Sequence, residues 1–294
     1  MSKDDIKTRL KELGIIGDKP HRAYTTWPED EVIKAFRAFS EVDTITIDPH
    51  KLGYVIYPAG GIAMRDKRMR ESIHTYAPYV FKKPAKNSPD IIIGSYILEG
   101  SKPGAAAAAV WTAHKIMPLN ITGYGKLIGE TIDGAQALFF SLNNADKIVL
   151  EKNITIEMLP VTKPDINIVN YAFNFSDNKS LTKMNELTKH ISENIFGFKT
   201  DDSQIMLEKS FIVSSTEFTY EEYGDSPMQF LKKIGIQKNE WDKVHEVKIV
   251  RSVIMSPYLT TDYVDENYVK MFIEKLKYKI LQNKTRIMEI FNEN

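Results

Sequence analysis

The second half of the chain switches repeatedly between alternating and helical hydrophobic spacing, and this limits the folds it can adopt. Runs of strand length, rich in β-branched and aromatic residues, occur at Ile154–Leu159, Ile166–Phe175, Phe211–Phe218 and Val247–Met255. Between them lies a helical pattern near residues 180–196, and a long one closes the chain at about 265–291. Strands interspersed with helices predict a compact α/β domain that begins near residues 145–150.

The first half contains sparser elements. The alternating run Thr44–Ile47 predicts a short strand, and residues 54–64 predict a strand, a turn and a second strand. Residues 76–89 are rich in Lys, Pro, Asn and Tyr, which predicts a long exposed loop. Helical spacing predicts four helices, at residues 3–13, 29–39, 105–117 and 126–142.

Composition excludes several classes of protein. The 294 residues include 39 Lys and Arg and 39 Asp and Glu, and this balance argues against nucleic-acid or polybasic membrane binding. Because Cys is absent, disulfides, Cys-ligated zinc, iron–sulfur clusters and thiol nucleophiles are excluded. The apolar runs Ile91–Leu98 and Ala105–Trp111 fall short of the about 18–20 residues of a spanning helix. With its charged start Met1–Asp5, the chain is expected to be cytoplasmic.

The segment Asp43–Tyr54 is the strongest candidate for chemistry. It places Lys51 just after a predicted buried strand, next to His50 and close to Gly53. An apolar surrounding disfavours an ammonium ion, so the amine of such a lysine becomes available to form an imine. Composition alone favours the simpler interpretation, in which Lys51 is an ordinary solvent-facing lysine.

Three long stretches resemble one enzyme family. Asp48-Pro49-His50-Lys51 is similar to the cofactor-lysine motif of the group II amino-acid decarboxylases that depend on pyridoxal 5'-phosphate (PLP). The longer stretch Ile45–Gly61 resembles the bacterial tyrosine decarboxylases in particular, as do Tyr96–Trp111 and Pro118–Gly129. Because the three stretches follow one another in the same order as in the family, the resemblance is specific.

The resemblance implies a fold and a set of site residues. The expected fold is α/β of the fold type I PLP-dependent transferase kind, with the C-terminal part of the large domain at residues 1–148 and the small α/β domain at 149–294. Lys51 would carry the PLP aldimine, and His50 and Asp48 would lie beside the cofactor phosphate. The substrate side would include Tyr57, and the tyrosine of the family's mobile loop, which protonates Cα, would be Tyr79 or the nearby Tyr76.

Two of these residues also have a purely structural interpretation, in which His50 is a core histidine and Tyr57 is an aromatic side chain of a strand.

The activity implied is decarboxylation of an L-amino acid, either tyrosine or a related aromatic or acidic amino acid. An arginine clamp on the α-carboxylate would oppose departure of that group, so we expect Arg251 to be a paired, structural arginine. The family's small polar residue near the substrate ring corresponds to Val253, or to Ser252 if the register shifts by one residue.

Some groups of the family motif are absent from this sequence. The family acid that pairs with the pyridine nitrogen lies in an Asp-Ala-Ala stretch, and no such stretch occurs here. Three interpretations follow: a half enzyme completed by a complementary N-terminal fragment, a truncated and inactive remnant, or a protein with a binding or assembly role. Relatives of this type resemble dimers, so a homodimer is a further expectation.

Overall fold

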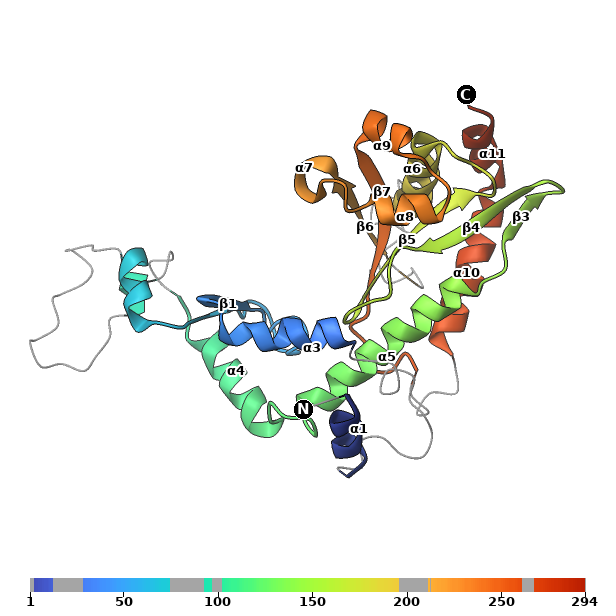
Figure 1. Ribbon diagram of the computed structural model, residues 1–294. Coiled ribbons are helices and arrows are strands. Elements are labelled where there is room, and N and C mark those ends of the chain that lie inside the picture. Colours follow the sequence, from blue (N-terminus) through green and yellow to red (C-terminus); the bar gives the residue numbers. More distant parts are fainter. Residues whose placement is uncertain are drawn as a thin grey trace, which may run out of the picture. The chain divides into compact units, whose positions relative to one another are not determined.

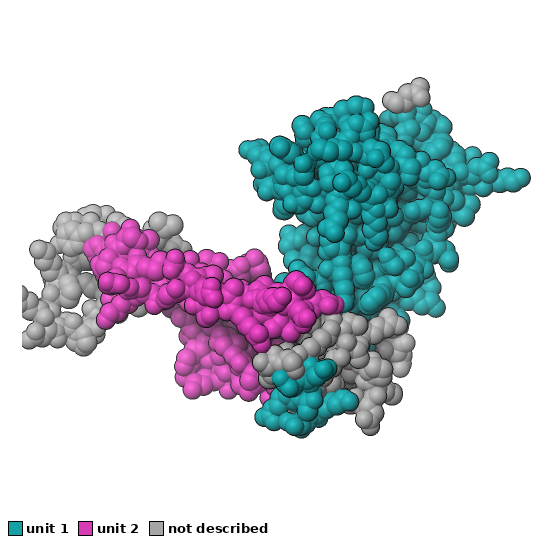
Figure 2. All heavy atoms as spheres, in the orientation of Figure 1, with its two compact units in different colours: residues 1–28, 127–294 teal, residues 29–126 magenta. Residues whose placement is uncertain are grey.

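The computed structural model describes residues 3–12, 29–74, 93–96, 102–195, 211, 213–260 and 267–293 (Figure 1). Its contacts divide the chain into two compact units (Figure 2). Unit 1 comprises residues 1–28 and 127–294, and unit 2 comprises residues 29–126. This division falls inside one long helix, because most of that helix packs on the C-terminal sheet. The predicted boundary at 148–149 is the one between the large and small domains of the expected fold, and it stays a prediction.

Unit 2 contains short elements around a small two-stranded ladder. Strands β1 (Thr44–Ile47) and β2 (Gly61–Met64) pair antiparallel, with Thr44 opposite Met64 and Ile47 opposite Gly61. The remaining elements are helices α3 (Asp30–Arg37) and α4 (Ala105–Ile116), the start of α5 (Tyr124–Asn143), and the 3₁₀ segments η1 (Ala38–Ser40), η2 (Lys67–Ile73) and η3 (Ile93–Tyr96). The predicted strand at 44–47 and the helices near 29–39, 105–117 and 126–142 are therefore confirmed.

The strand predicted to begin at Tyr54 is wrong. Tyr54 has a φ of 53°, in the left-handed region that strands do not use. The amide of Val55 donates to the carbonyl of Pro49 rather than to a neighbouring strand. The chain therefore turns through residues 54–60 before β2 begins.

Unit 1 is built on a five-stranded antiparallel sheet of order β3-β4-β5-β7-β6. Its strands are β3 (Ile148–Glu151), β4 (Ile154–Pro160), β5 (Ile168–Phe175), β6 (Ser214–Thr219) and β7 (Glu246–Val253). The four predicted strands are confirmed, and β3 is an additional edge strand. With its helices, this sheet confirms the predicted α/β class.

Each face of the sheet has its own apolar cluster, because successive side chains of a strand point to opposite faces. On one face, Val169, Tyr171, Phe173 and Phe175 of β5 pack with α5, α10 (Tyr268–Gln282) and α11 (Lys284–Asn292). On the other, Ala172 of β5 packs with α8 (Met228–Lys233) and α9 (Lys238–Val244). The short helix α7 (Tyr220–Tyr223) follows β6, and α1 (Lys3–Glu12) matches the predicted N-terminal helix.

Helix α6 (Leu181–Lys189) is continued by the π-helical turn His190–Ile195. Its side chains hydrogen-bond the backbone of β5 and β7 where these two strands no longer pair with each other. β5 and β7 pair only over Ile168–Tyr171 and Val250–Val253. Beyond that point, Asn185 of α6 donates to the carbonyl of Glu246 (2.8 Å) and accepts from the amide of Lys248 (2.9 Å). Thr188 accepts from the amide of Phe173 and donates to its carbonyl.

The long closing helix predicted over 265–291 is two helices. Asn283 separates α10 from α11, and its side-chain amide donates to the carbonyl of Lys279 (2.9 Å). Asn side chains that bond nearby backbone compete with helix continuation, which explains the break. Within the described part of the chain, no helix has both the length and the apolarity that a membrane crossing requires.

Candidate active site

Lys51 lies in a tight turn directly after β1. Its amide donates to the carbonyl of Asp48 (3.0 Å), and the amide of Tyr54 donates to the Lys51 carbonyl (3.0 Å). A further bond from Val55 to Pro49 (3.1 Å) closes the turn. Several short-range backbone bonds thus fix the direction in which the Lys51 side chain leaves the chain.

The Lys51 amine is paired with a carboxylate and reaches solvent. Its Nζ lies 2.7 Å from Oδ2 of Asp48, and the Lys51 side chain is 59% exposed. This bond to Lys51 holds the pKa of the Asp48 carboxyl below its usual value. Three of the four β1 residues are exposed, so the expectation of a buried strand and an apolar surrounding for Lys51 is wrong in this structure.

His50 and Tyr57 stack beside this pair. Their ring centroids are 3.9 Å apart, with an angle of 35° between the planes. Nδ1 of His50 bonds the carbonyl of the buried Ala59, whereas Nε2 lies 4.0 Å from Oδ1 of Asp48. A proton on Nδ1 leaves Nε2 as a donor only when the imidazole is charged.

The structure therefore brings four of the predicted site residues together. Asp48, His50, Lys51 and Tyr57 all lie in or beside the same turn. Tyr79 and its alternative Tyr76 lie outside the described residues.

These residues fit the reactive parts of PLP. The aldehyde needs a primary amine that the cofactor can reach, and the exposed Lys51 supplies one. The phosphate needs hydrogen-bond donors, and a charged His50 offers Nε2–H. Asp48 accepts but does not donate, so its carboxylate suits the lysine ammonium better than a phosphate.

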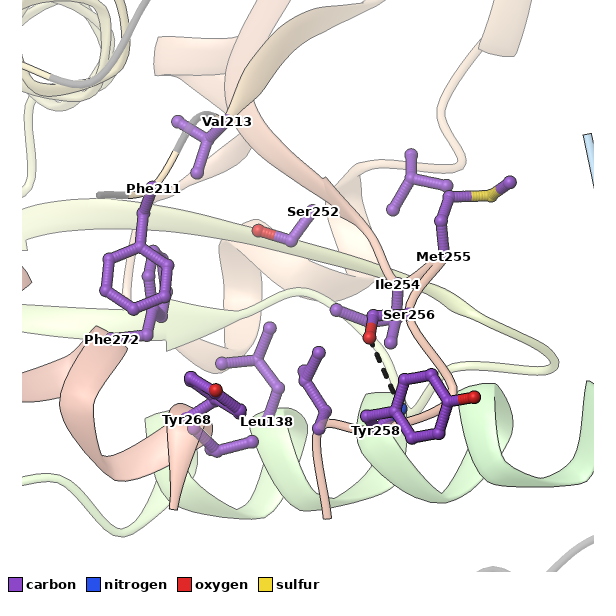
Figure 3. A pocket seen from close by; sticks show the side chains of 13 residues that line it. Leu138, Phe211, Val213, Ser252, Ile254, Met255, Ser256, Tyr258, Tyr268 and Phe272 are labelled. Atoms are coloured by element: carbon purple, nitrogen blue, oxygen red, sulfur yellow. Dashed lines mark hydrogen bonds between the residues drawn. The ribbon is translucent and has the colours of Figure 1, made fainter. Parts of the chain in front are cut away.

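Unit 1 holds an apolar cavity of about 580 Å³ near the end of β7 (Figure 3). Leu138 of α5 and Phe272 of α10 line it, together with the two residues proposed for substrate recognition, Ser252 and Val253. The Ser252 side chain is buried, and its hydroxyl lies 3.1 Å from the hydroxyl of Tyr171. Both register alternatives therefore line one cavity, and of these two only Ser252 carries a hydroxyl; Ser256, Tyr258 and Tyr268 line the cavity as well.

A second, more polar hollow of about 390 Å³ lies beside β5, β6 and β7. Arg251, Asn170 and Thr216 line it, and the Asn170 Oδ1 atom is buried without a partner among the described residues. The exposed Arg251 side chain likewise makes no hydrogen bond or ion pair within the described part of the chain. The expectation of a paired, structural arginine thus finds no support.

Among the residues that the structure describes, no three His, Asp or Glu side chains are grouped so that they could hold a metal ion. Sequence reasoning also missed one residue near the turn, Tyr124, whose hydroxyl donates to the carbonyl of Gly53. The signal for it was the stretch Pro118–Gly129, which we identified by resemblance without assigning its residues a role.

Comparison with known proteins identifies relatives over most of the chain. An L-tyrosine decarboxylase of Enterococcus faecium is 45% identical over 252 residues, which are 86% of this chain and 40% of that protein. An L-tyrosine decarboxylase of Enterococcus faecalis is 36% identical over 95% of this chain and 43% of its own length. An L-aspartate decarboxylase of Thermococcus kodakarensis is 34% identical over 44% of this chain and 29% of its own length.

The chain thus spans about two fifths of the tyrosine decarboxylases that it matches. Among solved structures, apo mouse CSAD aligns with 85% of this chain and 42% of its own, at 12% identity and a TM-score of 0.49. The family described as "Tyrosine decarboxylase, C-terminal" matches residues 134–282, about half of the sequence. The chain belongs to this tyrosine decarboxylase C-terminal family, as the three sequence stretches predicted.

Proposed function

We propose that this chain carries the PLP-attachment part of an enzyme that decarboxylates an L-amino acid to its amine and carbon dioxide. The observation that carries the proposal is Lys51, an accessible amine on a hydrogen-bonded turn with His50, Tyr57 and Asp48 around it. Membership of the tyrosine decarboxylase family supports the same activity and a fold type I architecture.

Each residue of the turn has a part in this proposal. PLP supplies an electron sink for the electron pair that the departing carboxylate leaves behind. Lys51 provides the amine to which the cofactor attaches, and Asp48 accepts a hydrogen bond from its ammonium form. His50 would donate a hydrogen bond to the phosphate, and Tyr57, whose ring stacks on the imidazole, would face the substrate. Tyr79 would return a proton to Cα.

The substrate that we favour is tyrosine or a related aromatic amino acid. The support is the apolar cavity near β7, to which Ser252 adds a polar side chain, and the names of the relatives with 36–45% identity. An acidic substrate is the alternative, supported by the aspartate decarboxylase relative and by the Arg251 hollow.

The wider setting is part of the same proposal. We propose a cytoplasmic enzyme that works as a homodimer or together with a complementary N-terminal fragment. Such a fragment would supply the acid for the pyridine nitrogen, which the sequence lacks in its family context.

Cofactor attachment tests the proposal directly. The purified chain is incubated with PLP, reduced with borohydride and mapped by peptide mass spectrometry. We expect the adduct to concentrate on Lys51, and Lys51→Arg, which keeps the charge but removes the primary amine, to abolish it. Labelling spread evenly over the surface lysines would contradict the proposal. Carbon dioxide release from tyrosine and aspartate, with and without an Asp-Ala-Ala fragment, then identifies the substrate.

A non-enzymatic role in assembly is the second candidate. It is supported by large apolar side chains that unit 2 leaves in solvent, among them Ile56, Ile116 and Leu119, which are 84%, 78% and 70% exposed. Self-association without selective Lys51 labelling would favour this candidate.

A further inference from the structure

Tyr124 connects the start of α5 to the turn that carries Lys51. Its hydroxyl donates to the backbone carbonyl of Gly53, at 2.8 Å, across 71 residues of sequence. The ring itself is buried, with 5% of its surface exposed. Tyrosine hydroxyls that are buried usually have a partner, but a bond to the main chain of a turn fixes backbone rather than another side chain.

The turn that receives this bond is tight. A Cβ atom on Gly53 would lie 2.5 Å from the carbonyl oxygen of Pro49, so only glycine fits there. The next residue, Tyr54, holds a φ of 53°, which costs free energy for a residue other than glycine. A backbone in this state needs neighbours that hold it, and the Gly53 carbonyl is adjacent to the strained residue.

The loop before α5 is built to present Tyr124. Asn120 organises it: its side-chain oxygen accepts from the amides of Thr122 (3.1 Å) and Gly123 (2.9 Å), and its carbonyl accepts from Gly125 (2.9 Å). The amide of Tyr124 itself donates to the carbonyl of Pro118 (3.1 Å).

Two glycines and a histidine complete this support. Cβ atoms on Gly123 and Gly125 would meet the carbonyl oxygens of Pro118 and Asn120, at 2.2 and 2.9 Å. His114 of α4 packs edge-on against the Tyr124 ring, with centroids 5.6 Å apart. The loop before α5 and helix α4 therefore both restrict the position of the Tyr124 side chain.

We propose that Tyr124 is a positioning residue that holds the Lys51 turn in the conformation that receives the cofactor. The inference rests on the proposed function, because it concerns the same amine. It also gives a role to the stretch Pro118–Gly129, because the bond from Tyr124 to Gly53 joins two of the three family-like stretches.

The physical expectation is a loss of selectivity rather than of reactivity. Lys51 is exposed, so a loosened turn still presents an amine, but one that samples more orientations. One neutral hydrogen bond changes such an equilibrium by about two- to tenfold. Lys51 should then react with PLP more like an ordinary surface lysine.

The experiment compares the wild-type chain with Tyr124→Phe and Asn120→Ala. The second variant keeps the phenol but removes the side-chain bonds that shape its loop. Tyr96→Phe is the matched control, because it removes a phenol bond to Glu71 (3.3 Å) elsewhere in unit 2. The readouts are the ratio of PLP label on Lys51 to label on all other lysines, and hydrogen exchange of the Tyr54 and Val55 amides. Circular dichroism checks that each variant is folded.

We expect both test variants to lower the labelling ratio by about two- to tenfold and to speed amide exchange in the turn, and the control to do neither. If PLP labels Lys51 selectively in the wild-type chain and the labelling ratio is unchanged in Tyr124→Phe, this inference is overturned while the proposed function stands. An equal loss in Tyr96→Phe would also overturn it. If the wild-type chain shows no preference for Lys51, the proposed function falls, and the role of Tyr124 falls with it.

Discussion

At the scale of single residues, the ion pair between Asp48 and Lys51 decides how the candidate site behaves before a cofactor arrives. The carboxylate lies 2.7 Å from the ammonium and favours the charged form of Lys51. Because imine formation needs the neutral amine, the ion pair keeps Lys51 in its unreactive ammonium form. Because both side chains are exposed, the pair contributes little to folding.

Replacing Asp48 by Asn should therefore make Lys51 more reactive at lower pH. The amide keeps the size of the side chain and its hydrogen bonding, but it removes the charge that favours the ammonium. We expect the pH at which labelling of Lys51 is half-maximal to fall in Asp48→Asn. The measurement is borohydride-trapped PLP on Lys51 between pH 5.5 and about pH 9, at fixed time. A midpoint that rises or stays constant would contradict this role for Asp48.

Tyr171 predicts an alkaline limit to stability. Its side chain is fully buried, and burial raises the pKa of its phenol, with Ser252 hydrogen-bonded to the hydroxyl. The unfolded chain can release this proton above about pH 10, whereas the folded chain holds it. The free energy of unfolding should therefore fall by up to about 1.4 kcal/mol per pH unit above that value from this residue alone.

Tyr171→Phe should remove that dependence. The variant is expected to be less stable near neutral pH by about 1 kcal/mol, because the Ser252 hydroxyl loses its partner. Its stability should nevertheless decline less steeply above about pH 10 than that of the wild type. Urea unfolding between pH 8 and about pH 11 measures both slopes, and parallel slopes would refute the argument.

At the scale of elements, helix α6 supplies hydrogen bonds to backbone groups of β5 and β7 where these strands do not pair with each other. Thr188 is fully buried and bonds both backbone groups of Phe173, which β7 no longer reaches. Thr188→Val has nearly the same shape but leaves both groups unpaired. We expect it to lower the free energy of unfolding by about 1–3 kcal/mol.

Thr182→Val on the same helix is the matched control, because Thr182 is exposed. Its effect should stay within about 0.5 kcal/mol of wild type. Chemical denaturation of both variants gives the comparison, and equal losses would show that Thr188 acts through helix propensity rather than through the sheet.

At the scale of the whole molecule, the two units differ in how much core they contain. Both apolar clusters lie within residues 135–291, in unit 1. Among the described residues of unit 2, few apolar side chains are buried; they include Val32, Val55, Ala59 and Tyr124. Segments with few buried contacts open more often than the core does.

Limited proteolysis should therefore cut unit 2 first. We expect early cleavage within residues 29–126 and a surviving fragment that retains residues 127–294, as detected by mass spectrometry. Saturating PLP should slow cleavage near Lys51 if the cofactor binds the folded turn. Simultaneous loss of both units would mean that they unfold as one.

The elements that sequence predicted well are those whose signal is local. The strand at Thr44–Ile47 and the helix near 105–117 follow from residue spacing, and the cofactor-lysine motif from adjacent letters. The misses depend on single short-range hydrogen bonds that the spacing of apolar residues does not record. The break at Asn283 depends on one side-chain amide, and the turn after Tyr54 depends on a bond back to Pro49.

By itself, the sequence determined the α/β class, the family and the cluster of Asp48, His50 and Lys51, because neighbours in a chain are neighbours in space. Only the tertiary structure decided that Tyr57 stacks on His50 and that Tyr124 reaches Gly53 from 71 residues away. Such contacts form between surfaces that meet only when the chain has folded, and no local pattern records which surfaces those are.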